Sequence, residues 1–110
     1  MADAYKILGQ GQMANAIATL FTVTTGSWII KSVEIVNTGT TTQSFRTCIN
    51  GTTDANAWLG TSNDLISLTR GQSYRSDAGW TMALENGATI AAVTTTASQV
   101  TMTISGDQVT

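Results

Sequence analysis

The chain has 110 residues, which is enough for one domain with one core and too few for two. Its formal net charge is −2 and its five basic residues are scattered, which excludes the clustered positive surface that nucleic-acid binding requires. The absence of histidine excludes Ser-His-Asp and Cys-His catalysis, and a single cysteine excludes an internal disulfide. No apolar run is long enough for a membrane-spanning helix. We therefore expect no cofactor, no metal, no nucleic acid and no membrane contact.

The first half of the chain is typical of strands rich in threonine. We expect strands over residues 4–9, 18–25, 28–37 and 43–50, because β-branched side chains fit a pleated, half-buried surface. The window Met13–Leu20 has some helical character, but it runs directly into a strand-like segment, so we expect no helix there. The strand over residues 28–37 has apolar residues of both parities, which suits a strand covered in part on both faces, for instance by a neighbouring subunit.

We expect about five more short strands in the second half. Asn86-Gly87 is a strong hairpin-type signal, since both residues tolerate positive φ. The last strand, residues 99–106, alternates apolar residues with threonine and serine. The pattern predicts an all-β protein: a single antiparallel β-sandwich or jelly roll of about eight strands. We expect an N-terminal arm over residues 1–13 and the β-sandwich domain over residues 14–110.

A G-x-G-x-x-A pattern, formed by Gly9, Gly11 and Ala14, matches the fingerprint of a dinucleotide-binding turn. Glu34 lies twenty residues beyond Ala14, where a ribose-binding acid would belong. Such a site needs the pattern between a strand and a helix of a βαβ unit, and the segment that follows is too short for that helix. We interpret the glycines as residues that let the N-terminal arm turn or lie close against another backbone.

Four further residues are candidates for packing or for an interface. Cys48 lies in an alternating strand, where a small buried filler is the expected role. The tryptophans Trp28, Trp58 and Trp80 would either fill the core or anchor a protein interface or a stacked sugar. Trp58 lies at the edge of a polar loop and is the first choice for an interface.

The middle of the chain resembles a family of small bacteriophage virion proteins. The matching residues are Leu-Phe-Thr-Val at 20–23, an Ile-Val-Asn-Thr-Gly turn at 35–39 and Phe-Arg at 45–46. The opening segment and the last thirty or so residues also resemble the family, so the similarity spans most of the chain. Thr24 departs from it, because the family usually has a proline there, and residues 69–72 lack a proline that is frequent in the family.

The resemblance implies a non-enzymatic structural component of a tailed-phage virion, made in the cytoplasm of the host bacterium. A capsid decoration (cement) protein is the favoured role. It would bind the major capsid protein or other virion proteins as a homo-oligomer, with a trimer favoured. A tail, baseplate, collar or fibre protein is the alternative within the virion, and a carbohydrate-binding module is the alternative outside it. The interface candidates are Tyr5, Ile7, Leu8, Trp28, Trp58 and Trp80.

Overall fold

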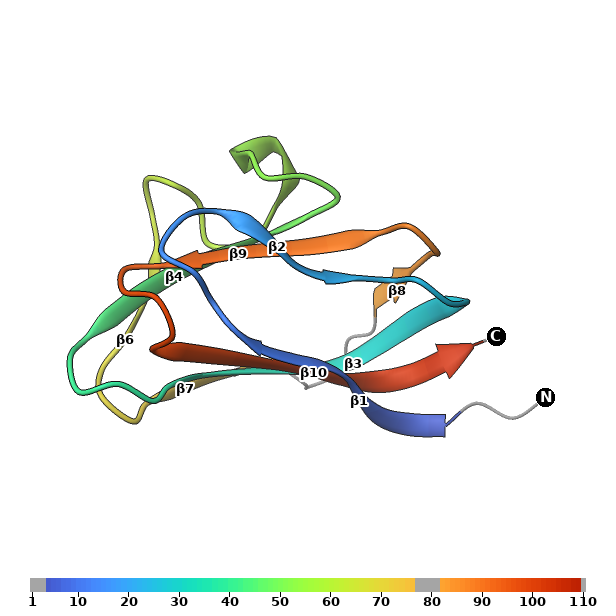
Figure 1. Ribbon diagram of the computed structural model, residues 1–110, viewed down its shortest axis with the longest axis horizontal. Coiled ribbons are helices and arrows are strands. Elements are labelled where there is room, and N and C mark those ends of the chain that lie inside the picture. Colours follow the sequence, from blue (N-terminus) through green and yellow to red (C-terminus); the bar gives the residue numbers. More distant parts are fainter. Residues whose placement is uncertain (1–3, 77–81, 110) are drawn as a thin grey trace.

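Two antiparallel β-sheets pack face to face in the computed structural model, which describes residues 4–76 and 82–109 (Figure 1). The prediction of an all-β sandwich is confirmed. The described elements are, in chain order, β1 (Ala4–Gln12), β2 (Ala18–Thr22), β3 (Ser27–Asn37), β4 (Gln43–Ile49), the 3-10 helix η1 (Asp54–Asn56), β5 (Ala57–Leu59), β6 (Ile66–Leu68), β7 (Ser73–Ser76), β8 (Met82–Leu84), β9 (Thr89–Thr94) and β10 (Val100–Val109).

The strand order is that of a jelly roll. Sheet A has the order β1-β10-β3, and β7 and β8 pair with successive parts of β3 on its far side. Sheet B has the order β2-β9-β4, and β5 and β6 share the far side of β4 in the same way. The strands therefore form four rows in each sheet, in agreement with the expected eight. The pairing is nested, because β1 pairs with β10, β2 with β9, β3 with β7 and β8, and β4 with β5 and β6.

The core lies between the two sheets and follows the alternation of their strands. Val100, Met102 and Ile104 on β10 are completely buried, as the alternation in the sequence predicts. Phe45 on β4 is also completely buried, and its ring meets Tyr74 of β7 edge to face, with a centroid distance of 6.0 Å. Each large side chain buried in this way stabilises the fold by about 1.5–3 kcal/mol.

A β-bulge at Lys31 explains the mixed parity of β3. Ile30 pairs with Gly106 and Ser32 pairs with Ser105, so Lys31 is an extra residue opposite no partner on β10. The bulge reverses the alternation, so apolar residues of opposite parity before it and after it face the core, while Ile29 and Val36 lie half-buried on the other side. The bulge accounts for most of the mixed parity, and coverage of the outer face by a neighbouring subunit stays a prediction.

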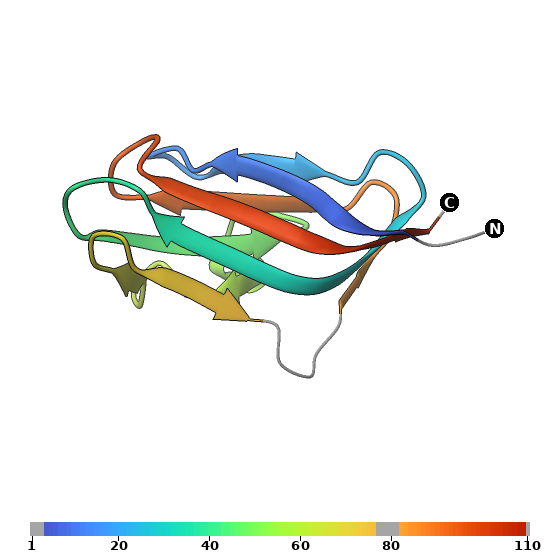
Figure 2. The ribbon, with the colours of Figure 1, turned by 90° about the horizontal axis from the view of Figure 1, so that it is seen from below.

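Residues 4–12 of the segment expected as an arm form β1, which pairs with β10 of the same chain (Figure 2). A bulge at Leu8 interrupts the pairing between Ile7 and Gly9. Met13, which follows, is buried in the core. The expected arm is therefore, over these residues, the first row of sheet A. The window Met13–Leu20 forms no helix, as expected, and leads directly into β2.

The turn at Asn86-Gly87 is present, but it does not form a hairpin. The N–H of Ala88 donates to the carbonyl of Glu85 at 2.9 Å, and Gly87 has a φ of 93°. However, β8 belongs to sheet A and β9 to sheet B, so the turn connects the two sheets. The prediction of a turn is confirmed and that of paired neighbouring strands is wrong.

The Asn37 amide holds the turn after β3. The side chain is completely buried and donates from Nδ2 to the carbonyls of Thr41, at 2.8 Å, and Leu68, at 3.0 Å. Its Oδ1 accepts from the N–H of Gly39 at 2.9 Å. This part of the phage-like sequence pattern is therefore a buried structural amide that connects two loops.

Candidate interaction surface

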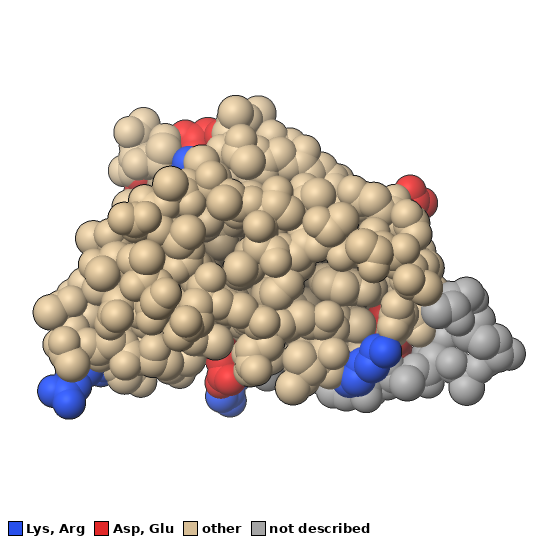
Figure 3. All heavy atoms as spheres, viewed as in Figure 1, with Lys and Arg blue, Asp and Glu red and all other residues tan. Residues whose placement is uncertain are grey.

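One side of the sandwich carries almost no charge. Residues 7–30 and 86–106 contain no Lys, Arg, Asp or Glu, and the fold joins them because β1 pairs with β10 and β2 with β9. The edge strands β1 and β2 lie at the front of the view in Figure 1, and Figure 3 shows the same side with charged atoms only near its margins. We call residues 7–12 of β1 together with β2 the uncharged edge face.

Both sheets end at this face. In the described part of the chain, β1 has β10 on one side and no strand on the other, and β2 likewise has only β9. An edge strand presents unpaired N–H and C=O groups, which natural proteins usually protect with charges, proline or short length. β1 has nine residues, the chain has no proline, and Lys6 is the only charged residue of β1. Its protective features are Lys6 and the bulge at Leu8.

Apolar side chains contribute to the uncharged edge face. Ile7 is 59% exposed, the largest exposed fraction among the large hydrophobic residues that the structure describes. Leu8, Leu20 and Phe21 are half-buried and pack against the core cluster. The face therefore combines open backbone groups with apolar side chains.

Gly9 and Gly11 bring β1 and β2 together. A Cβ atom on Gly9 would lie 2.8 Å from Cδ1 of Phe21, and one on Gly11 would lie 3.2 Å from Cδ1 of Leu20. The two side chains of β2 therefore rest on the backbone of β1 and close the gap between the sheets. Gly9 lies inside a strand, paired with Ile104, so the dinucleotide interpretation has no structural basis. The expectation that the glycines permit close packing is confirmed.

The opposite edges of the sandwich are protected in the ordinary ways. β5, β6 and β8 have three residues each and β7 has four. Across β3 and β7, Glu34 forms an ion pair with Arg75. Short edge strands resist pairing with another chain, and the charge on β7 adds to this effect.

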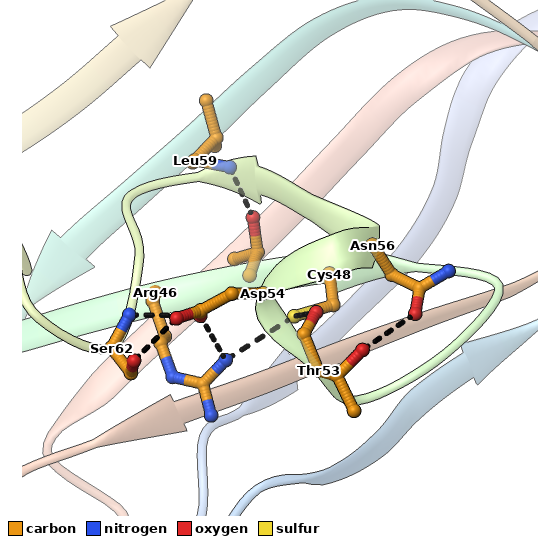
Figure 4. Close-up of polar contacts among 8 residues, drawn as sticks. Arg46, Cys48, Thr53, Asp54, Asn56, Leu59 and Ser62 are labelled. Atoms are coloured by element: carbon orange, nitrogen blue, oxygen red, sulfur yellow. Dashed lines mark hydrogen bonds and ion pairs between the residues drawn. The ribbon is translucent and has the colours of Figure 1, made fainter.

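A polar network holds loop 50–64 against the outer side of β4 (Figure 4). Arg46 extends from β4, with Nη1 3.5 Å from Oδ1 of Asp54, and the same atom donates to Sγ of Cys48 at 3.4 Å. The Cys48 thiol lies 3.5 Å from the carbonyl oxygen of Thr53 and is completely buried. The expected role of Cys48 as a buried residue is confirmed.

Asp54 is the centre of this network. Its carboxylate accepts from the N–H of Ser62 at 2.9 Å and from the Ser62 hydroxyl. These two bonds, with a smaller contribution from the Arg46 guanidinium, lower the pKa of Asp54 below its ordinary value. Nearby, the N–H of Leu59 donates to Oγ1 of Thr47 at 3.1 Å. These polar groups bind one another across the loop, which is the arrangement of a structural support.

Two shallow hollows occur elsewhere. One, of about 210 Å³, lies on the outer face of sheet A among Ser32, Thr103, Ser105 and the Glu34–Arg75 pair. It is smaller than the ~300–1,000 Å³ of ligand pockets. The other, of about 430 Å³, lies beside the turn at 83–88 and includes one charged side chain, Glu85. The first is lined mainly by polar side chains, two of which, Glu34 and Arg75, pair with one another.

The structure places two of the predicted interface residues on the uncharged edge face. Ile7 is exposed there and Leu8 is half-buried at the bulge. The backbone of Tyr5 pairs with Asp107 in β1, and its side chain lies outside the described residues.

The tryptophans do not belong to that face. Trp28 is 8% exposed and forms part of the core, so it has little surface to offer a partner. Trp58 lies on β5 at the opposite edge of sheet B, half-buried against the core cluster. Trp80 lies outside the described residues.

Sequence reasoning missed Leu20 and Phe21 as parts of the surface. The signal that would have found them is the absence of charge over residues 7–30 and 86–106, which is visible in the sequence. A search for motifs of particular residue types does not detect this absence of charge. The absence is shared by two segments that are distant in the sequence and that the fold brings together.

Comparison with protein-family models, with curated proteins and with solved structures gave no match. Within residues 4–76 and 82–109, no three side chains of the metal-binding types form a cluster. The same residues include no helix with the length and apolar character to cross a membrane.

Proposed function

We propose that this chain is a non-enzymatic structural subunit of a tailed-phage virion and serves there as a capsid decoration protein. The observation that carries the proposal is the uncharged edge face, where two open sheet edges meet beside the exposed side chain of Ile7. A surface of this kind is suited to binding another protein surface rather than to transforming a small molecule.

The outer face of sheet A supports the same role. Thr101, Thr103 and Ser105 point outward along β10, opposite the buried residues of that strand. Small hydroxyl groups lose little on being covered, because water or a partner satisfies them equally well. Copies repeated on a symmetric shell would add avidity to each weak contact. The turn and strand segments resemble those of phage virion proteins. This resemblance favours a phage particle as the shell on which such copies would lie.

The test is a cryo-electron microscopy reconstruction of the particle that carries this chain, with its copies counted. Density repeated over the whole icosahedral shell would support decoration. Density confined to the tail, collar or baseplate would overturn decoration and retain the virion role. Absence from every particle would overturn the proposal.

A glycan titration separates the carbohydrate-binding alternative. Trp58 packs against the core and is half-buried, so we expect the tryptophan fluorescence of the purified chain to stay constant as glycans are added. A saturable fluorescence change with one glycan class would instead favour a sugar-binding module.

A further inference from the structure

We propose that the uncharged edge face is a self-association surface, occupied by a second copy of this chain whose β1 pairs antiparallel with the first. The inference rests on the proposed structural role. It adds that a second copy of the chain is the partner at this face. Its test requires no phage particle.

The contrast between the edges of sheet A identifies β1 as the pairing strand. On one edge, β7 and β8 are short, and Arg75 of β7 forms an ion pair with Glu34. On the other, β1 runs for nine residues with no charge beyond Lys6. One edge of the same sheet thus has the features that block strand addition, and the other largely lacks them.

Charge identifies the partner as a second copy. A charged strand placed against residues 7–12 would lose its hydration without meeting an opposite charge, which costs free energy. A copy of the same face introduces no charge at all between Ile7 and Gln12. It also brings apolar side chains to cover the exposed Ile7. The face is therefore complementary to itself.

The geometry allows both sheets to take part. A two-fold axis perpendicular to the sheets would make β1 antiparallel to its copy and, in the other layer, β2 antiparallel to its copy. Sheet A would then continue from four rows to eight across the axis. This arrangement is a dimer, whereas the phage resemblance implies a trimer.

A stable contact must extend beyond β1 and β2. Residues 7–12 form a strand segment about 20 Å long, and the side of the molecule shown in Figure 3 measures 45 by 26 Å. A stable interface buries about 800 Å² on each partner, so the dimer would also cover neighbouring residues on this side.

The first experiment measures the mass of the full chain by light scattering over a range of concentrations. Ile7→Lys and Gln10→Lys add a charge to exposed positions of β1, and Ser73→Lys does the same on β7. We expect a dimer for the natural chain and for Ser73→Lys, and at least a tenfold weaker dimer for each β1 variant. Circular dichroism and thermal unfolding confirm that each variant is folded. A monomer or trimer for the natural chain, or equal weakening by Ser73→Lys, would overturn the proposal.

The second experiment detects the pairing directly by disulfide formation in a Cys48→Ala background. Single cysteines replace Ile7, Gln10 or Gln12 on β1, and Ser73 on β7 serves as the control. Residues that face their own copy across a two-fold axis bring their Cβ atoms to about 4.5–5.5 Å, close enough for a disulfide. We expect a covalent dimer at one β1 position or at two adjacent ones. No dimer on β1, or as much dimer at residue 73, would overturn the pairing.

The two proposals can fail separately. A chain that covers the shell but is monomeric in solution would retain the decoration role and overturn the β1 pairing. A dimer linked through β1 that binds no particle would do the reverse.

Discussion

The two sides of the sandwich use different chemistry to hold the same fold. At the uncharged edge face, Phe21 and Leu20 pack directly on glycine backbone, and no ion pair is available from residues 7–30. At the far side, loop 50–64 is held by Arg46, Asp54 and their hydrogen bonds. The comparison teaches that loop 50–64 on the far side is held by charged and polar groups that have partners within the chain. The open backbone edges of the other side do not, in the part that the structure describes.

The largest expected effect tests the close backbone packing of β10 against β3 at the bulge. A Cβ atom on Gly106 would lie 1.9 Å from the carbonyl oxygen of Ile29, a backbone atom that cannot rotate away. We expect Gly106→Ala to destabilise the chain by at least about 3 kcal/mol, measured by urea unfolding. Ser105→Ala is the control, because Ser105 points outward, and it should change stability by less than about 0.5 kcal/mol. Equal effects would contradict this account of the bulge.

A smaller effect tests the contact between β1 and β2. Gly9→Ala pushes a methyl group into the Phe21 ring, which can move only in part, so we expect a loss of about 1–3 kcal/mol. In a Phe21→Leu background the same substitution should cost clearly less, because the smaller side chain leaves room. A double-mutant cycle by chemical denaturation measures this coupling. Additive effects would show that Gly9 and Phe21 do not constrain one another.

On the far side, the comparison predicts that the partly covered ion pair matters more than the exposed one. Arg46 has a side chain 14% exposed, and Arg46→Met removes its bonds to Asp54 and Cys48 while keeping most of its volume. We expect a loss of about 1 kcal/mol in thermal unfolding. Arg75→Met breaks an ion pair that is largely exposed and should cost less. The reverse order would show that Arg46 contributes little to holding the loop.

The smallest expected effect is a pH dependence confined to the far side. The pKa of Asp54 is lower in the folded chain than its ordinary value of 3.8, so its contribution to stability is complete above that value. The contribution is lost as the pH falls through the folded pKa. Thermal unfolding of the natural chain and of Asp54→Asn should therefore differ at pH 7, and the difference should shrink as the pH falls below the ordinary carboxyl value. A difference that stays constant down to pH 2 would show that the Asp54 charge does not stabilise the loop.

Strand positions were largely predictable from the sequence, and the exceptions have local causes. The alternation over residues 99–106 predicts β10 and its buried face because the strand is regular there. The bulge at Lys31 was not predictable, because it depends on pairing with β10, a strand distant in the sequence. At the bulge, β10 has Gly106, which has no side chain, so the backbone of β3 can come close. The turn at 86–87 was recognised from its residues, but its neighbours went to different sheets, which local turn chemistry does not determine.

The candidate surface was predictable only in part. Ile7 and Leu8 were named from the N-terminal segment, and both lie on the uncharged edge face. Trp28 was named for its residue type, yet its place on the inward side of β3 makes it a core residue. Exposure depends on which face of a strand a residue occupies, and a bulge upsets that assignment.

The nested pairing has a consequence for how the chain reaches its structure. Among the described strands, β1 is synthesised first, and β10, the strand with which it pairs, is synthesised last. Contacts this distant in sequence form slowly, because a long loop must close before they stabilise anything. During that delay, a nine-residue strand whose one charged residue is Lys6 is available to any other nascent copy. The spacing of ribosomes on the messenger RNA and the rate of synthesis would then influence which strand β1 meets first. That strand is either β10 of its own chain or a strand of another nascent chain.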